Sequence, residues 1–275
     1  MRKREVQDIL NTLKISPKKR LGQNFLIDSN IANKFIIESN LSRDDIVLEI
    51  GPGLGALTEL LVRKAKKVYA VEIESQFCSF LSKKFSNCKN LEIIHGDILE
   101  IDLPPHHNKV ISNIPYSITG PLLEKVFYKV RPAFGVLTVD KKIGERMFLT
   151  KSHQNFSRIS ITLNSFMEPI KKYNISRNCF YPIPNIDLLM VILKPKKNLN
   201  DFLSNDKNID YFLRFVAGIM PYKNKNLINA LKFYLKEDKE KIIKKLQGTN
   251  FKNSKLFNLD IDDFINLSKI FQTQN

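Results

Sequence analysis

The sequence predicts an α/β protein built on a doubly wound parallel sheet and followed by a smaller all-helical domain. Five short β-branched runs alternate with longer helix-compatible segments between residues 46 and 140, the pattern of strands and crossover helices in a parallel sheet. Two later runs, 168–176 and 188–195, are close enough in sequence to form an antiparallel edge. After Pro195 the chain becomes polar, then helical and lysine-rich, so we predict domains over residues 1–198 and 199–275.

The predicted strands share a short apolar core and end at a polar residue or a glycine. They cover residues 46–50, 67–72, 91–97, 109–113 and 134–140. Helix-compatible segments lie between them, including residues 57–65 and 75–85. Ligands of an open α/β sheet bind beyond the carboxyl ends of its strands. The residues that follow each strand are therefore the first candidates for a functional site.

Composition favours a soluble protein without a membrane anchor or a disulfide framework. The 275 residues are 43% hydrophobic and 26% charged, an ordinary balance for a globular chain. No apolar run is long enough to cross a bilayer, and the charged N-terminus lacks the apolar segment of a secretory signal. The three cysteines are too scattered for a disulfide framework, and the four histidines share no metal-ligand spacing. We therefore expect a cytoplasmic protein without a metal site.

The net charge of +16, from 44 lysines and arginines against 28 acidic residues, favours a polyanionic partner. Basic residues are dense near the N-terminus, at Arg2, Lys3, Arg4, Lys14, Lys18, Lys19 and Arg20. Because the chain has no Trp and no evident amphipathic membrane helix, nucleic acid is preferred over a membrane surface as the partner. A basic surface that only reflects an AT-rich genome is the alternative.

A glycine loop and two acids follow the first three predicted strands. Gly51, Gly53 and Gly55 form a G-x-G-x-G loop whose backbone can approach a ligand closely, because no Cβ collides with it. Glu72 is placed to accept hydrogen bonds from the two hydroxyls of a ribose, and Asp97 from the amine of an adenine. S-adenosylmethionine fits this set better than NAD, whose pyrophosphate would need a cradle at the helix N-terminus. A tight turn with two surface acids is the alternative.

An Asn-Ile-Pro-Tyr stretch follows the fourth predicted strand. Pro115 pushes the residue before it out of the helical region, so Ile114 is held extended and its carbonyl can face a ligand. The amide of Asn113 offers a second acceptor. Two acceptors suit an adenine N6 amine, since accepting both N–H bonds favours a pyramidal nitrogen with its lone pair aimed at a methyl group. Tyr116 offers a flat face for a flipped-out base; a proline turn with a buried tyrosine is the alternative.

Four segments of the chain resemble the ribosomal RNA adenine dimethyltransferases. Residues 113–116 resemble the motif of amino-group methyltransferases, and KKRLGQNFLID at 18–28 matches this family closely. EIGPGLGALT at 49–58 resembles its cofactor loop, and FYPIPNID at 180–187 resembles its F-x-P-x-P segment. The segments occur in the family's order, and together they resemble its KsgA-type, small-subunit branch.

The resemblance also implies site residues that spacing alone does not reveal. Asn24 and Leu26 would line the cofactor, and Phe180 would cover the target base opposite Tyr116. Glu49, directly before the glycine loop, would either face the sulfonium side of the cofactor or cap the sheet. The implied catalytic set is Asn113, Ile114, Pro115, Tyr116 and Phe180. The cofactor set is Asn24, Leu26, Gly51, Gly53, Glu72, Asp97 and Asn113.

By the same resemblance, the first domain is a Rossmann-like class I S-adenosylmethionine-dependent methyltransferase domain, and the helical domain recognises RNA or the ribosome. The protein would dimethylate N6 of two adjacent adenosines near the 3′ end of small-subunit ribosomal RNA and serve small-subunit biogenesis. Its substrate would be the RNA within a pre-formed small subunit, and the enzyme would be a monomer.

Two alternatives stay open, and a third is disfavoured. An Erm-type large-subunit dimethyltransferase is one, although such sequences usually lack the glycine before Gln23. A ribosome-binding assembly factor that keeps the fold but not turnover is the other. An NAD oxidoreductase is disfavoured because nothing in its chemistry requires Asn-Ile-Pro-Tyr.

The chain departs from the family at positions outside the chemical core. Asp140, Lys141 and Lys142 stand where Gln-Lys-Glu is usual, and Phe156, Ser157 and Arg158 where Tyr-Gly-Arg is usual. Further departures are Asn185, Ile186, Leu188 and Ile228. Helical spacing could present one set of lysines to phosphates, namely Lys223, Lys225, Lys232, Lys236 and Lys239; a solvated helix face is the alternative. We therefore expect an intact catalytic core with an altered RNA-contacting periphery.

Overall fold

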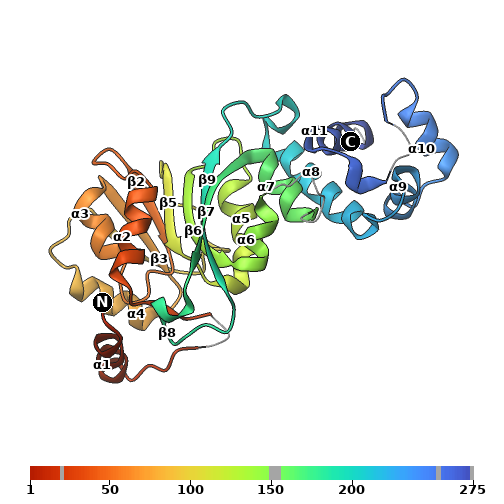
Figure 1. Cartoon of the computed structure of the whole chain (residues 1–275). Helices are drawn as coiled ribbons and strands as arrows, with labels where there is room; N and C mark the ends of the chain where they lie inside the picture. Colours follow the sequence, from red (N-terminus) through yellow and green to blue (C-terminus); the bar gives the residue numbers. More distant parts are fainter. Residues whose placement is uncertain (19–21, 149–155, 252–254, 273–275) are drawn as a thin grey trace. The chain divides into compact units, whose positions relative to one another are not determined.

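The computed structural model describes residues 1–18, 22–148, 156–251 and 255–272 (Figure 1). Its largest element is a seven-stranded sheet with the strand order β4-β3-β2-β5-β6-β9-β7. The strands are β2 (Ile46–Ile50), β3 (Lys67–Glu72), β4 (Leu91–His95), β5 (Lys109–Asn113), β6 (Phe134–Asp140), β7 (Met167–Ile175) and β9 (Leu188–Pro195). Neighbouring strands from β4 to β6 are parallel, and β9 runs antiparallel to β6. The predicted parallel sheet is confirmed, and the two later runs, as β7 and β9, lie together at one edge of it, with β9 antiparallel to β6.

Strand order reverses beside β2, which separates β3 and β4 on one side from β5 and β6 on the other. Because crossovers between parallel strands are right-handed, the helices before and after this reversal cover opposite faces of the sheet. The helices of this region are α2 (Ser29–Glu38), α3 (Thr58–Lys64), α4 (Ser75–Lys84), α5 (Thr119–Phe127) and α6 (Lys141–Met147). The carboxyl ends of the strands at such a reversal are where α/β proteins bind ligands.

A separate two-stranded sheet joins two distant segments of the chain. Strand β1 (Phe25–Leu26) pairs antiparallel with β8 (Phe180–Tyr181), with Leu26 opposite Phe180. Helix α1 (Lys3–Leu13) precedes β1 and packs Val6 and Leu10 into a cluster with Phe25. Two of the segments that resemble the dimethyltransferases are thus held together by backbone hydrogen bonds. Lys19, Arg20 and Leu21 of the first segment lie outside the described residues.

Contacts divide the chain into two compact units, and the second unit is not continuous in sequence. The first unit comprises residues 1–127, 132–144 and 169–195. The second comprises residues 128–131, 145–168 and 196–275. Its helices are α7 (Arg158–Phe166), α8 (Asp206–Ile219), α9 (Leu227–Leu235), α10 (Lys239–Leu246) and α11 (Ile261–Phe271). The chain after residue 198 is helical as predicted, while α7, from before that position, contacts α8 and α11.

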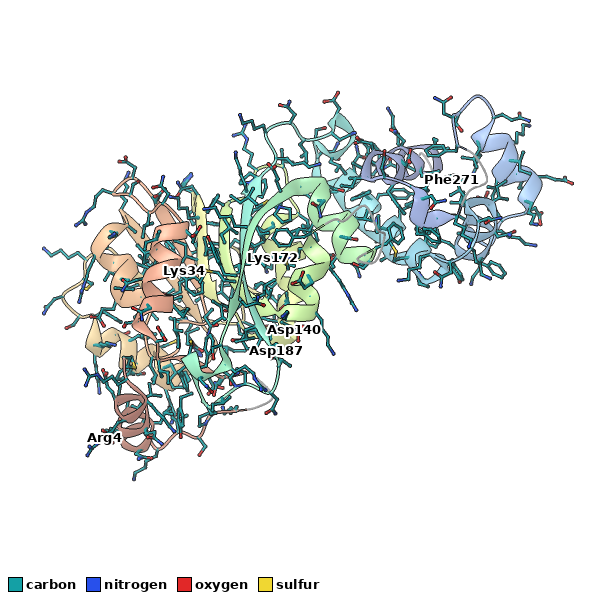
Figure 2. All side chains as sticks on the ribbon, in the orientation of Figure 1. Arg4, Lys34, Asp140, Lys172, Asp187 and Phe271 are labelled. Carbon is teal, nitrogen blue, oxygen red and sulfur yellow. The ribbon has the colours of Figure 1, made fainter. Side chains whose placement is uncertain are left out.

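Two of the departures from the family have structural roles. The Asp140 carboxylate accepts hydrogen bonds from the backbone N–H groups of Lys142, at 2.7 Å, and Ile143, at 3.2 Å. It therefore caps the start of α6, at the end of the β6–β9 pair where Asp187 also lies (Figure 2). Leu188 is buried in the core, so its apolar side chain contributes to packing.

The expectation that five lysines share helical spacing is wrong. Lys223 and Lys225 lie in the turn after the 3₁₀ helix Met220–Tyr222, Lys232 lies in α9, and Lys239 begins α10. Lys236 ends α9 in the left-handed conformation, with φ of 56°. The lysines do not share one helix because the left-handed cap at Lys236 and the extended residue Asn226 before α9 divide the segment into separate elements. The five lysines therefore belong to several elements and not to one helix face.

Within the described ranges, no helix is long and apolar enough to span a bilayer. No group of three or more metal-binding side chains is found in the same ranges. His153 lies outside them.

Candidate functional site

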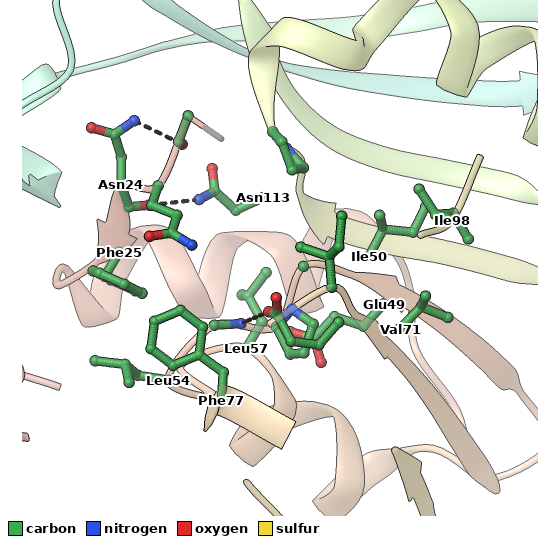
Figure 3. A pocket seen from close by; sticks show the side chains of 18 of the residues that line it. Asn24, Phe25, Glu49, Ile50, Leu54, Leu57, Val71, Phe77, Ile98 and Asn113 are labelled. Atoms are coloured by element: carbon green, nitrogen blue, oxygen red, sulfur yellow. Dashed lines mark hydrogen bonds between the residues drawn. The ribbon is translucent and has the colours of Figure 1, made fainter. Parts of the chain in front are cut away.

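A pocket opens at the carboxyl ends of β2, β3, β4 and β5, entirely within the first unit (Figure 3). It encloses about 1120 Å³, part of which is open to solvent. Its lining includes the predicted cofactor residues, namely Asn24, Leu26, Gly51, Gly53, Glu72, Asp97 and Asn113. The structure therefore brings together side chains that are far apart in sequence.

The glycine loop forms one wall of the pocket and lies beside the Asn-Ile-Pro-Tyr stretch. Gly51 and Gly53 have φ of +66° and +55°, in the left-handed region that favours glycine. A Cβ on Gly51 would lie 3.6 Å from Cδ of Pro115, and a Cβ on Gly53 would lie 3.1 Å from the Phe25 ring. The backbone conformation thus favours glycine at both positions, and at Gly53 the close approach of the Phe25 ring favours it as well.

Two acids occupy the ends of successive strands. The Glu72 carboxylate accepts hydrogen bonds from the N–H groups of Gly53 and Glu74, each at 3.0 Å. Burial raises the pKa of Glu72, while these two hydrogen bonds act in the opposite direction. Oδ1 of Asp97 accepts a hydrogen bond of 2.8 Å from the N–H of Leu99. Both acids are therefore fixed by backbone donors at the wall of the pocket.

A network of side-chain hydrogen bonds fixes Asn113 at the end of β5. Its Nδ2 donates to the carbonyl of Asn24 at 3.1 Å, which identifies the amide nitrogen, because a carbonyl only accepts. Its Oδ1 accepts from the hydroxyl of Tyr116 at 3.1 Å and from the hydroxyl of Thr138. Burial raises the pKa of Tyr116 well above its usual range, so this hydroxyl keeps its proton and donates. Asn113 is therefore held with its carbonyl oxygen occupied by two hydroxyl groups.

The residues predicted to contact a base are packed more tightly than expected. Ile114 and Phe180 are each 1% exposed, and Tyr116 is 9% exposed. Tyr116 and Phe180 belong to the same core cluster. Pro115 lines the pocket. Tyr116 and Phe180 are not among the described residues that line it. The face that Tyr116 would offer to a base is covered in this conformation.

The segment before β1 supplies the opposite wall. The Asn24 side chain donates to the backbone carbonyl of Gly22 at 2.9 Å, and the backbone carbonyl of Asn24 accepts from the side-chain amide of Asn113 (Figure 3). Leu26 is 4% exposed, and Phe25 packs edge-on against Phe77 with ring centroids 5.6 Å apart. These contacts connect the segment to the end of β5 and to α4.

Glu49 lines the pocket and is also bonded within the protein. It is 2% exposed and accepts a hydrogen bond of 2.7 Å from the hydroxyl of Thr58. Burial raises the pKa of Glu49 to about 8, and the nearby charge of Glu72 adds to the effect. Glu49 therefore both lines the pocket and bonds to the start of α3. Its contact with the sulfonium of a cofactor stays a prediction.

Several lining residues were not identified from the sequence. Ile73 and Ile98 directly follow the two acids and line the pocket beside them, an acid-isoleucine pair at each strand end that could have been noticed. Met1 also lines the pocket, and Lys18 forms a 2.7 Å ion pair with Glu74 at the loop after β3. No sequence pattern indicated that Met1 lines this pocket or that Lys18 pairs with Glu74.

A parallel sheet with a glycine loop, acids at the next two strand ends and Asn-Ile-Pro-Tyr at the fourth defines a class I methyltransferase. The model of the family described as "Ribosomal RNA adenine dimethylase" matches residues 15–273. The chain therefore belongs to the ribosomal RNA adenine dimethylase family.

Known proteins similar to this chain agree with that assignment. A Fusobacterium nucleatum protein named Ribosomal RNA small subunit methyltransferase A is 36% identical over 264 residues, covering 93% of this chain and 97% of the relative. The crystal structure of a dimethyladenosine transferase from Plasmodium falciparum has a TM-score of 0.75 at 28% identity, covering 88% of this chain and 95% of that one. The crystal structure of the 23S rRNA methyltransferase ErmE shares the fold, with a TM-score of 0.64 at 21% identity. The match covers 90% of this chain and 99% of that one.

Proposed function

We propose that this protein uses S-adenosylmethionine to dimethylate N6 of two adjacent adenosines near the 3′ end of small-subunit ribosomal RNA. The observation that carries the proposal is the position of Asn113. Its amide is fixed at a strand end, within a pocket that the glycine loop and Pro115 both line. This arrangement supports a role for Asn113 as an acceptor for an exocyclic amine, beside a pocket that would hold a nucleoside cofactor.

The residues present fit S-adenosylmethionine. Small-molecule sites combine apolar walls with a few polar groups that fix the orientation of the ligand. Here Glu72 would accept from the ribose hydroxyls, Asp97 would accept from the adenine amine, and Ile73 and Ile98 would contact the ring. When bound, the cofactor supplies an activated methyl group.

The chain's own residues would hold the target amine. Oδ1 of Asn113 and the carbonyl of Ile114 would each accept one N–H of the adenine amine, directing its lone pair toward the pocket. Because Oδ1 of Asn113 accepts from two hydroxyls, one of them must turn away when the base enters. Tyr116 and Phe180 would flank the base after a local rearrangement of their packing. Catalysis would then depend mainly on positioning in a water-excluded site.

The proposed substrate is the RNA within a pre-formed small subunit. The enzyme would act on it as a monomer in the cytoplasm. Relatives named for the small subunit support a small-subunit substrate over an Erm-type activity. The Fusobacterium nucleatum relative is 36% identical to this chain, whereas ErmE is 21% identical and resembles it in fold. The test is methyl transfer to small and large subunits that lack the modification, followed by mapping of dimethyladenosine. Transfer to the large subunit alone would support the Erm-type alternative, and no transfer to either would support a non-catalytic assembly factor.

Glu72→Ala is expected to weaken S-adenosylmethionine binding by about 1.5–3 kcal/mol, the range for hydrogen bonds to charged groups. The variant removes the proposed ribose acceptor and also the partner of the Gly53 N–H. Calorimetry measures the affinity. Glu72→Gln, which keeps one acceptor oxygen, should lose less, and Glu100→Ala at an exposed position should lose nothing. Unchanged affinity in Glu72→Ala, or tight NAD binding by the wild type, would contradict the cofactor assignment.

Lys232→Gln is expected to reduce the salt dependence of subunit binding by roughly one unit of slope, the contribution of one phosphate contact. Lys232 is exposed on α9, so its ammonium group is accessible to RNA. Binding to small subunits across a salt series measures the slope. Lys67→Gln is the matched control, because Lys67 is ion-paired with Glu92 in the first unit. An unchanged slope in Lys232→Gln would assign this lysine to a solvated helix face.

A further inference from the structure

Two aromatic rings are stacked at the surface of the second unit. Tyr222 ends the 3₁₀ helix Met220–Tyr222, and Phe233 lies in α9. Their ring centroids are 5.5 Å apart and the planes differ by 22°. Phe233 is 50% exposed and Tyr222 is half-buried. Single exposed apolar residues are common on proteins, but a stacked pair already presents an ordered flat surface.

A lysine completes this surface. Nζ of Lys225 lies 4.6 Å from the centroid of the Phe233 ring. The backbone of Lys225 is fixed on both sides, because its N–H donates to the carbonyl of Tyr222 at 2.8 Å and its carbonyl accepts from Leu256 at 3.0 Å. We call Tyr222, Phe233 and Lys225 the aromatic platform. Its backbone is held in place, while the lysine side chain stays exposed to solvent.

The charge around the aromatic platform suits a polyanion. Residues 222–236 contain four lysines and no acidic residue. Lys232 precedes Phe233 in sequence and is exposed, and Lys223 is exposed beside Tyr222. Aromatic faces next to lysines are the combination that binds single-stranded nucleic acid, since rings stack on bases and ammonium groups contact phosphates. The lysines of this segment, with no acidic residue among them, favour RNA over a protein partner.

We propose that the aromatic platform stacks an unpaired base of ribosomal RNA, while Lys225 contacts an adjacent phosphate. This inference rests on the proposed function, because it assumes that ribosomal RNA is the substrate. It adds a second base-contacting site in the second unit, separate from the pocket where methyl transfer would occur. The platform would thus recognise an unstacked nucleotide of the substrate that is not itself methylated.

The test uses the full-length protein and a fluorescent, unstructured RNA of about ten nucleotides, within the range that one binding surface covers. Phe233→Ala is expected to weaken binding of this RNA by about 5- to 150-fold, as for removal of one base-stacking ring. The salt slope should stay unchanged, since no phosphate contact is removed. Lys225→Gln should instead reduce the slope by roughly one unit. Phe233→Tyr, which keeps a ring, should retain wild-type affinity.

Further variants separate stacking from general apolar contact. Phe233→Leu keeps an apolar side chain without a ring and should bind as weakly as Phe233→Ala. Ile243→Ala is the matched control, because Ile243 is 45% exposed on α10 and outside the aromatic platform. Since Phe233 is half-exposed, all variants should keep the wild-type melting temperature, which is measured alongside.

The outcomes distinguish failure of this inference from failure of the proposed function. If the wild type methylates small subunits but Phe233→Ala and Phe233→Leu bind the RNA like the wild type, the aromatic platform is not a base-stacking site. If Phe233→Ala binds the oligonucleotide normally but binds whole subunits weakly, the platform contacts another part of the subunit, and the assignment to an unpaired base is overturned. If the wild type transfers no methyl group to any ribosomal subunit, the proposed function itself fails.

Discussion

Asn113→Ala is expected to slow methyl transfer by about 10² or more, the scale for losing one preorganised polar group in an active site. The substitution removes the acceptor proposed to orient the target amine, and it also removes the partner shared by the Tyr116 and Thr138 hydroxyls. Single-turnover methyl transfer to small subunits, at saturating cofactor, measures the effect on the chemical step. Calorimetry on the same variant should show cofactor affinity largely retained.

Thr138→Val is the matched control for this experiment. It removes one of the two hydroxyls that donate to Asn113, while the amide and its bond to the Asn24 carbonyl stay in place. We expect a much smaller loss of rate than in Asn113→Ala. Near-normal turnover in Asn113→Ala would exclude the proposed role of the amide. A loss explained wholly by weaker cofactor binding would assign Asn113 to the cofactor alone.

Stability is expected to fall as pH rises from about 4.5 to about 8, through the ionisation of Glu49. Burial raises the pKa of Glu49 from its ordinary 4.5 to about 8. Between these values the folded protein holds a proton that the unfolded chain releases, so the free energy of unfolding decreases with pH. One proton gives a slope of about 1.4 kcal/mol per pH unit. Glu49→Gln should remove this contribution and keep an acceptor for the Thr58 hydroxyl.

Urea denaturation of the wild type and of Glu49→Gln at a series of pH values isolates the effect. The difference between the two proteins should change with pH across this window and be constant below it. Glu100→Gln, at an exposed position, should follow the wild type throughout. Parallel curves for the wild type and Glu49→Gln would show that Glu49 is ionised in the folded protein.

Local patterns determine most of the first unit, which is why the sequence predicted it well. Each parallel strand is a short β-branched run, and each is followed by a residue whose chemistry suits the ligand edge of a sheet. The observed strands β2, β3, β5 and β6 begin and end where they were predicted. Glu72 and Asp97 reach the pocket wall because the carboxyl ends of parallel strands meet at one edge.

What the sequence did not reveal depends on contacts between distant segments. The pairing of Leu26 with Phe180 spans more than half the chain, and neither two-residue strand has a periodic pattern. Thr138 lies inside an apolar strand, so its hydrogen bond to Asn113 follows only from the sheet register, in which the two residues are neighbours. The packing of Tyr116 and Phe180 likewise depends on the assembled core, which composition and motif cannot describe.

The discontinuous second unit also determines the order in which the protein can fold during synthesis. Helix α7 buries Ile161, Leu163 and Phe166, and its partners α8 and α11 are translated later. At about 5–20 residues per second, the ribosome needs roughly 5–20 seconds to make the chain between α7 and the end of α11. Until Phe271 is made, α7 lacks α11, whereas α8 is available after Ile219 and the strands of the large sheet are complete after Pro195. A nascent chain released early would permanently expose the part of α7 that contacts α11, so premature termination within the last eighty residues should yield aggregation-prone protein and not a smaller working enzyme.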